Sequence, residues 1–361
     1  MRVAIVGGTG NVGSAILDAL ADTPEVTSVL GLARRLPDKD AHPYSTASWA
    51  TVDIGAQPDA SVSGPGRDVV VDRLAELFDG VDAVIHLVHA IQPNHDRALL
   101  RRVNVGGTVR VAKAVVRAGV RHLVMASSWA VYSPVDDDVP RDESAPRDGI
   151  PSSHYSVDKR DQERVLDALE AAHPEITVTR MRTGLVFSEP AGAQVVRLFL
   201  GPYVPLRLLV PGTLPFLPLP TGARAHVVHA EDVGRAYALA VARRVGGAFN
   251  IAADDVLWPA DLARVVDGGR YVEISPRVVR PLLHAAWRAR LSASDAGWLD
   301  MAMGVPLMDG TRARTELGWH PRRGAEETLR EMLLGMVERR GRASIPMRPR
   351  DTRWHDTAPP A

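Results

Sequence analysis

The feature that most constrains this fold is a glycine-rich turn near the N-terminus. Residues 3–6 form a short apolar run, Gly7, Gly10 and Gly13 follow at fixed spacing, and residues 12–20 have helical periodicity. Gly7 permits a tight turn, Gly10 lets the backbone approach a ligand, and Gly13 lets the helix pack closely on the strand. A plain turn between a strand and a helix needs one glycine, so three at this spacing favour a dinucleotide site with its pyrophosphate at the helix N-terminus.

The turn gives the first set of predicted cofactor contacts. They are Gly7, Thr9, Gly10, Asn11, Val12 and Gly13.

Short β-like runs then alternate with helical patterns through the first half of the chain. The predicted strands are 3–6, 28–32, a run ending near Asp53, 83–87, 123–126 and 176–180, with later candidates at 226–229 and 248–251. Such alternation predicts an α/β fold with a Rossmann-like, doubly wound parallel sheet and right-handed crossovers.

The loss of this rhythm after residue 184 predicts two parts. We expect a dinucleotide-binding domain from residues 1–185, with 226–253 returning to it. We expect a smaller, mostly helical substrate-binding part from 186–225 and 254–340. The residues from 341 to 361 are rich in Pro, Arg and Thr, which predicts a disordered tail.

Composition excludes several classes of protein. The 361 residues include 43 Lys and Arg, 43 Asp and Glu, and no cysteine. The balanced charge gives no argument for binding nucleic acid or an anionic membrane. The lack of cysteine excludes disulfides and thiolate metal sites and fits a cytoplasmic protein. His86 and His89 lie three apart on a strand end, a spacing that points to opposite faces, so no metal site is predicted.

The end of the second predicted strand bears on the choice of cofactor. An NAD enzyme commonly places a carboxylate there to accept a hydrogen bond from the ribose hydroxyl. This chain instead has Arg34 and Arg35, whose guanidinium groups suit a 2′-phosphate. The pattern favours NADP over NAD, with a solvated turn arginine as the alternative.

Tyr155 and Lys159 are the candidate catalytic pair. They lie four residues apart at the start of a predicted helix and therefore share one face. A nearby ammonium lowers the pKa of a phenol, which otherwise lies near 10. The tyrosine can then exchange a proton with a substrate oxygen while hydride moves to or from a nicotinamide. The alternative is a surface helix with a solvated lysine.

A third candidate lies at the end of the fifth predicted strand. Residues 126–128 read Ala-Ser-Ser, which brings hydroxyl groups to the carboxyl edge of the sheet, where ligands bind in open α/β folds. A serine there can orient the substrate oxygen. The seven tryptophans, Trp298 among them, are more typical of packing than of a ligand cage.

Several motifs in order give the chain a family resemblance. Besides the glycine turn, they are Asp53-Ile54, residues 84–87 (Val-Ile-His-Leu), 104–108 (Asn-Val-Gly-Gly-Thr), 127–132, Tyr155-Ser156-x-x-Lys159, 228–233 and 317–321. Over residues 1–335 the chain resembles an extended short-chain dehydrogenase/reductase of the NAD-dependent epimerase/dehydratase family.

The resemblance implies roles for individual residues. Ser128, Tyr155 and Lys159 would be catalytic, and Lys159 would also bond the cofactor ribose. Asp53 and Ile54 would contact the adenine, and Leu87 and Asn104 would lie against the cofactor. Capping of a turn by Asp53, or of a helix by Asn104, is the alternative for these two.

Departures from the family pattern bear on the substrate. The arginine that often grips a nucleotide-sugar diphosphate is displaced by one position, to Arg224, and residues 198–220 are apolar and rich in proline. We therefore expect a small-molecule substrate that is apolar rather than a nucleotide sugar. Trp129 and Ala130 follow Ser128 where a dehydratase usually has a carboxylate, so a reductase or an epimerase is favoured.

Two further expectations follow from the same comparison. A homodimer is expected by analogy with similar proteins. The rival function is a non-catalytic NAD(P)-binding sensor on the same fold, which has no need of the Tyr–Lys pair.

Overall fold

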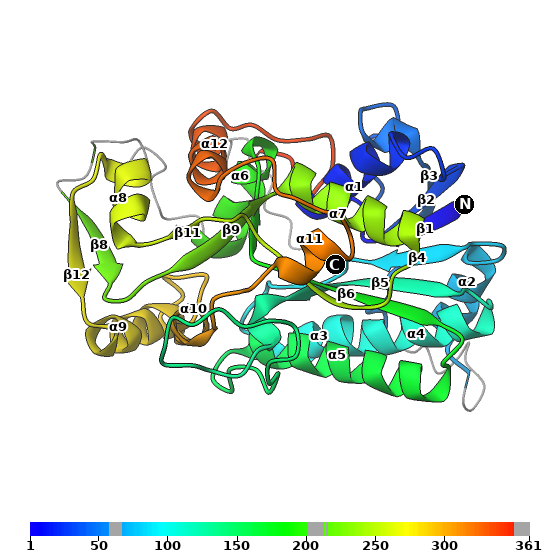
Figure 1. Cartoon of the computed structure of the whole chain (residues 1–361), viewed down its shortest axis with the longest axis horizontal. Helices are drawn as coiled ribbons and strands as arrows, with labels where there is room; N and C mark the ends of the chain where they lie inside the picture. The colour runs from blue at the N-terminus through cyan, green and yellow to red at the C-terminus, as the bar shows by residue number, and fades with distance from the viewer. Residues whose placement is uncertain (58–66, 201–212, 214–215, 350–361) are drawn as a thin grey trace.

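A seven-stranded parallel sheet organises the first part of the molecule. The computed structural model describes residues 1–57, 67–200, 213 and 216–349. The strand order is β10-β6-β5-β4-β1-β2-β3 (Figure 1). The strands are β1 Arg2–Val6, β2 Ser28–Ala33, β3 Ser48–Thr51, β4 Ala83–His86, β5 His122–Ser128, β6 Thr177–Thr183 and β10 Gly247–Ile251. The predicted Rossmann-like fold is confirmed.

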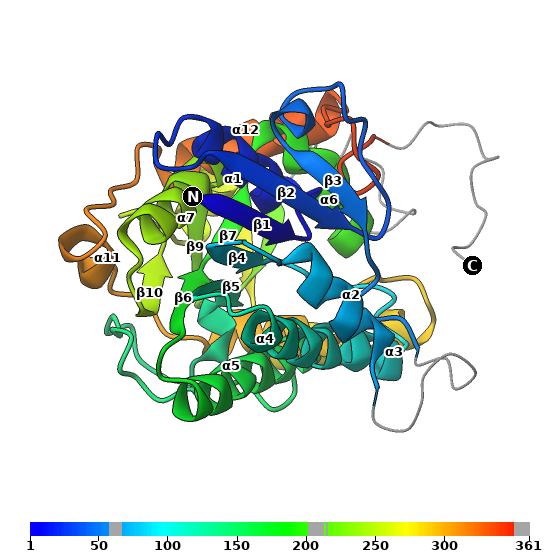
Figure 2. The same cartoon turned by 90° about the vertical axis from the view of Figure 1, so that its right-hand side faces the viewer.

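Helices cover both faces of this sheet (Figure 2). One face carries α1 Asn11–Ala21 and α7 Ala230–Arg243, whose apolar side chains share one buried cluster. The other face carries α2 Val69–Leu77, α4 Gly107–Arg117 and α5 His154–Ala172, with a second cluster. The central strands are apolar on both faces because both faces are covered.

The long helical stretch between β4 and β5 is interrupted. It is built from α3 Arg97–Arg101, a π-helical stretch η2 Arg102–Gly106, and α4. Asn104 lies inside the π-helical stretch, a form that is frequent at functional sites.

The strand predicted at 226–229 differs from expectation in its location. β9 Ala225–His229 pairs with β7 Leu185–Phe187 and β11 Val256–Leu257 in a separate three-stranded sheet. Gly184 permits the departure from the main sheet, because a Cβ there would lie 2.6 Å from the His226 carbonyl oxygen. Within 226–253, only β10 joins the main sheet.

The remaining described chain forms a smaller part that is mostly helical. Its elements are η4 Glu189–Ala191, α6 Gly192–Val195, η5 Val196–Leu200, β8 Leu217–Pro220, α8 Pro259–Asp267, β12 Tyr271–Ile274, α9 Pro276–Arg288, α10 Ala296–Gly304, α11 Thr311–Thr315 and α12 Ala325–Val337. Two short 3-10 helices, η1 Tyr44–Thr46 and η3 Trp129–Val131, belong to the first part. Much of the apolar stretch at 198–220, and most of the loop before α2, lie outside the described residues.

The start of the predicted disordered tail is packed. Ser344 and Met347 are buried, and the Arg197 guanidinium donates to the carbonyls of Ile345, Pro346 and Arg348. The predicted disorder is therefore wrong for residues 341–349. Their backbone carbonyls find hydrogen-bond partners in the fold, which the polar composition does not indicate. Residues 350–361 lie outside the described residues.

Among the described residues, no helix has the length and apolarity needed to cross a membrane.

Candidate active site

The glycine turn has the geometry that the spacing predicts. Gly7 has φ +97°, and a Cβ there would lie 2.9 Å from Val88. A Cβ on Gly13 would lie 2.6 Å from the Gly8 backbone, so only glycine lets α1 approach the turn this closely. At Gly10 the nearest atom to an added Cβ is a Gln194 side-chain nitrogen at 3.8 Å, which leaves the backbone open to a ligand.

A pocket of about 340 Å³ lies beside this turn. Six of the predicted cofactor residues line it: Gly7, Thr9, Arg34, Arg35, Asp53 and Ile54. The rest of the lining is Val6, Leu32, Ala33, Val52, Val88, His89, Ala90, Gln92, Pro93, Leu99, Val103 and Pro346. The ends of β1, β2, β3 and β4 therefore converge on one cavity at the carboxyl edge of the sheet.

Arg34 and Arg35 give this pocket a positive end. Both follow β2, both side chains are exposed, and neither is ion-paired with a carboxylate within the described part of the chain. Burial lowers the pKa of Arg35, and the charge on Arg34 lowers it further. Two unpaired cations at the strand end can receive an anionic group.

Asp53 and Ile54 also line this pocket. Asp53 Oδ1 accepts a hydrogen bond of 2.9 Å from the Gly55 N–H, so Asp53 also caps a turn. Ile54 is buried and packs where a Cβ on Gly107 would lie 2.6 Å from it. The capping alternative for Asp53 and its place in the pocket are thus both present.

Asn104 holds the loop that follows β4. Its Oδ1 accepts from the Ala90 N–H at 2.6 Å, and its Nδ2 donates to the Ala90 carbonyl and to Asp158 Oδ2. The side chain is fully buried and does not line the pocket. Asn104 therefore fixes the position of Ala90, which lines the pocket, relative to α5.

Six other predicted contacts also lie outside this pocket lining, namely Gly10, Asn11, Val12, Gly13, Leu87 and Lys159. Asn11 points its side chain toward β7, where Nδ2 donates to the Val186 carbonyl. Val12 packs against the core cluster, and the Leu87 N–H donates to the Val6 carbonyl. The backbones of Asn11, Val12 and Leu87 flank the turn, while their side chains support the fold.

Tyr155 and Ser128 are brought together as the sequence predicts. Ser128 ends β5, and Tyr155 lies in the first turn of α5, which Ser153 caps by accepting from the Ser156 N–H. Burial raises the pKa of Tyr155, and the nearby Ser128 hydroxyl offsets part of this rise.

Lys159 lies one turn further along α5. Its ammonium donates to the Ala126 carbonyl at 2.6 Å and lies 6.0 Å from the centre of the Tyr155 ring. Burial lowers the pKa of Lys159 to about 7, although Glu163 and Asp158 act in the opposite direction. The lowered phenol pKa expected from the sequence is not found here, because burial dominates at Tyr155.

The contacts of aromatic side chains with Tyr155 were not predicted from the sequence. The His89 ring meets the Tyr155 ring edge-on at 4.8 Å, and Trp298 of α10 lies on it at 5.0 Å. Phe199 packs against Trp298 at 5.0 Å. Trp298 and Phe199 are remote from Tyr155 in sequence and carry no motif, and His89 stood out only for its spacing from His86.

Arg224 and the possible metal ligands complete the comparison with the sequence. Arg224 donates to the carbonyls of Asp137 and Val305 and pairs with Asp138. Across the described residues, no cluster of three or more His, Cys, Asp or Glu is arranged to hold a metal ion.

Comparison with known proteins identifies relatives for this chain. The family model described as the NAD dependent epimerase/dehydratase family matches residues 3–252. The UDP-glucose 4-epimerase of Streptomyces lividans is 27% identical over 332 residues, covering 88% of this chain and 91% of that protein. The L-arabinose 1-dehydrogenase (NAD(P)(+)) of Haloferax volcanii is 31% identical over 170 residues, which span 44% of this chain and 57% of that protein.

Solved structures share the fold. A UDP-glucose 4-epimerase from Stenotrophomonas maltophila with bound NAD and formylated UDP-arabinopyranose has a TM-score of 0.67 and 18% identity, covering 94% of this chain and 98% of that chain.

Proposed function

This chain belongs to the NAD-dependent epimerase/dehydratase family, and we propose that it is an NAD(P)-dependent oxidoreductase or epimerase that uses Tyr155 as its acid and base. The observation that carries the proposal is the placement of Tyr155 beside Ser128 at the carboxyl edge of the sheet, with Lys159 one turn further along α5. The dinucleotide pocket opens at that same edge. A sensor has no need of this hydroxyl pair, so the non-catalytic alternative is not favoured.

The residues divide the chemistry among them. The dinucleotide, when bound, supplies or accepts a hydride at the carbinol or carbonyl carbon of the substrate. Ser128 orients the substrate oxygen by hydrogen bonding. Tyr155 donates its proton to that oxygen during reduction and recovers one during oxidation. Lys159, held by the Ala126 carbonyl, favours the phenolate when it is charged.

The two parts of the chain serve different partners in this proposal. Residues 1–185, with α7 and β10 returning, hold the dinucleotide. The substrate contacts come from the smaller part, which brings Phe199 and Trp298 toward Tyr155.

The substrate proposed is a small alcohol or ketone with an apolar portion. Trp298 and His89 contact the Tyr155 ring, and Phe199 packs against Trp298. Arg224 is committed to backbone carbonyls and Asp138, which speaks against its use on a nucleotide-sugar diphosphate. Trp129 and Ala130 are buried and cannot supply a dehydratase carboxylate, so reduction or epimerisation is favoured.

The cofactor proposed is NADP in preference to NAD. Its support is the pair Arg34 and Arg35, unpaired within the described residues and lining the pocket. NADPH is expected to bind several-fold more tightly than NADH, and Arg34→Ala with Arg35→Ala should remove the difference. Fluorescence titration of both cofactors measures this, and a clear NADH preference in the native protein would refute it.

A homodimer through α4 and α5 is also proposed. A largely apolar groove of about 420 Å³ lies between these helices, lined by Val109, Ala112, Lys113, Val116, Val165, Ala168, Leu169, Ala172 and His173. Sedimentation velocity should give twice the chain mass, and Val116→Glu should give the monomer.

The decisive experiment compares native protein with Tyr155→Phe. We expect cofactor binding to persist and turnover to fall at least about 100-fold, because only the transferable proton is removed. Tyr271→Phe, a change on the exposed strand β12, is the matched control and should leave turnover unchanged. Unchanged turnover in Tyr155→Phe would overturn the assignment.

A further inference from the structure

The C-terminal segment, residues 341–349, is anchored beside the glycine turn. The Asp38 N–H donates to the Ala343 carbonyl at 2.9 Å. Arg342 lies 3.3 Å from Asp18 of α1. Arg197 of η5 holds three carbonyls of the segment at 2.7 to 3.0 Å. The segment thus bridges the dinucleotide domain and the smaller part.

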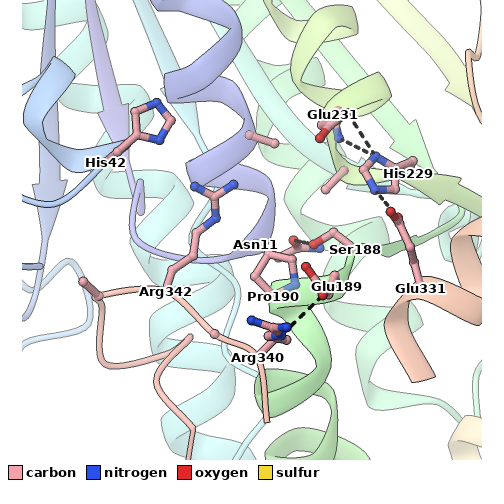
Figure 3. A pocket seen from close by; sticks show the side chains of 14 residues that line it. Asn11, His42, Ser188, Glu189, Pro190, His229, Glu231, Glu331, Arg340 and Arg342 are labelled. Carbon is pink, nitrogen blue, oxygen red and sulfur yellow. Dashed lines mark hydrogen bonds and ion pairs between the residues drawn. The ribbon is translucent and has the colours of Figure 1, made fainter. Parts of the chain in front are cut away.

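One side of this segment borders a polar pocket of about 530 Å³ (Figure 3). There Arg340 reaches toward Glu189, and His229 pairs with Glu331 at 2.9 Å. These polar side chains interact with each other. The other side of the segment places Pro346 in the wall of the dinucleotide pocket.

A buried hydroxyl network joins the segment to the turn. The Ser344 hydroxyl donates to the Thr9 carbonyl at 2.8 Å. The Tyr44 hydroxyl lies 2.9 Å from Ser344 Oγ and 3.0 Å from Ser14 Oγ. The Gly10 carbonyl in turn accepts from the Ser14 N–H and lies 2.9 Å from Ser14 Oγ. Tyr44 is fully buried and Ser344 is nearly so.

These bonds fix which way the turn's N–H groups point. A trans peptide is planar, and its C=O and N–H point in opposite directions. Holding the Thr9 carbonyl toward Ser344 therefore directs the Gly10 N–H away from Ser344. Holding the Gly10 carbonyl toward Ser14 does the same for the Asn11 N–H, which donates to Gln194 Oε1 at 3.3 Å. Free N–H groups at a helix N-terminus are what a diphosphate binds.

We infer that Ser344 is a positioning residue of the dinucleotide site, which orients the Gly10 N–H toward the cofactor diphosphate from more than 300 residues away in sequence. The inference rests on the proposed function only in taking the glycine turn as the diphosphate site. The ligand class is a nucleoside diphosphate, and the recognition is by backbone N–H groups.

The test is Ser344→Ala in the full-length chain. Removing the hydroxyl leaves the Thr9 carbonyl with only the longer hydrogen bond of 3.4 Å from the Tyr44 hydroxyl among the described residues, so the peptide is held less firmly. The Kd for NADPH, measured by fluorescence without substrate, should therefore rise about 3- to 10-fold. ADP should lose affinity to the same degree, whereas adenosine, which lacks the diphosphate, should not. The kcat at saturating cofactor should change less than twofold.

Two variants separate positioning from general damage. Thr328→Val, on α12, removes another buried hydroxyl that donates to a backbone carbonyl, that of Gly324 just before the helix, and should leave the cofactor Kd unchanged. Tyr44→Phe keeps the ring but removes the bridging hydroxyl, and should raise the Kd less than Ser344→Ala does.

The outcomes distinguish this inference from the proposed function. An unchanged Kd in Ser344→Ala, or an equal loss for adenosine and ADP, would overturn the inference. If the native protein bound no dinucleotide, the proposed function would fail first. If it bound one but turned over no substrate, the Kd comparison would still decide the role of Ser344.

Discussion

Lys159 is a buried cation that stability alone would not favour. The residue is 3% exposed, and within the described part of the chain its ammonium makes one hydrogen bond, to the Ala126 carbonyl. Burial lowers its pKa from 10.5 to about 7. Protonation of Lys159 is therefore less favourable in the folded protein than in the unfolded chain, and this difference lowers the stability of the folded protein. Functional residues often carry such a cost.

This cost predicts the behaviour of Lys159→Met. The penalty is fully present below pH 7, where both states carry the charge, and it disappears as the pH approaches 10.5, where neither does. The variant should therefore lose turnover yet melt several degrees higher than the native protein at pH 6, with a smaller gain at pH 9.5. Thermal melts at the two pH values measure this. An equal or larger gain at pH 9.5 would contradict the assigned pKa.

The candidate catalytic residues could be proposed from the sequence because their spacing is local. Tyr155 and Lys159 share a helical face through four-residue spacing, and Ser128 ends a recognisable strand. The contacts of Trp298 with Tyr155 and of Ser344 with Thr9 were not predicted, because they depend on the tertiary structure. No local pattern marks a residue that acts through a distant part of the chain.

At the scale of elements, glycines decide how closely helices approach. α1 and α7 pack side by side over one face of the sheet (Figure 2). A Cβ on Gly234 of α7 would lie 2.4 Å from the Ala15 carbonyl oxygen of α1. α1 begins at the glycine turn, so this contact also holds the turn in place.

We therefore expect Gly234→Ala to destabilise the protein although alanine is the better helix former. The overlap is with backbone, so the helices must separate, at a cost of about 1–3 kcal/mol. Gly106→Ala is the matched control, because a Cβ there would meet nothing nearer than 4.0 Å, and it should be neutral or stabilise by up to about 1 kcal/mol. Urea denaturation measures both. Equal effects would show that helix propensity, and not the close approach, governs Gly234.

The predicted elements are confirmed where the buried residues follow a simple periodic pattern along the sequence. The main sheet was foreseen because its strands are short apolar runs that alternate with amphipathic helices. The pairing of β9 in a second sheet was not predicted, because the sequence of residues 226–229 is equally compatible with either sheet. The choice depends on Gly184, which lets the chain turn away after β6.

At the scale of the whole molecule, histidines give the fold a dependence on pH. Burial lowers the pKa of His86 to about 3 and that of His122, His154 and His226 to about 4. The buried His122 Nε2 lies 2.8 Å from Thr179 Oγ1, and His226 Nε2 accepts from the Met308 N–H. These rings are packed in neutral form across both parts of the molecule.

Stability should therefore fall as the pH drops below about 6.5. There the unfolded chain takes up protons that the folded protein refuses until pH 3 to 4, so each neutral histidine costs up to about 1.4 kcal/mol per pH unit. His122→Gln cannot titrate and keeps a group able to bond Thr179, so its urea midpoint should fall less than that of the native protein between pH 7 and 5. His320→Gln, at an exposed position, should follow the native profile. If the His122 variant lost stability as steeply as the native protein, the acid sensitivity would have to arise from carboxylates.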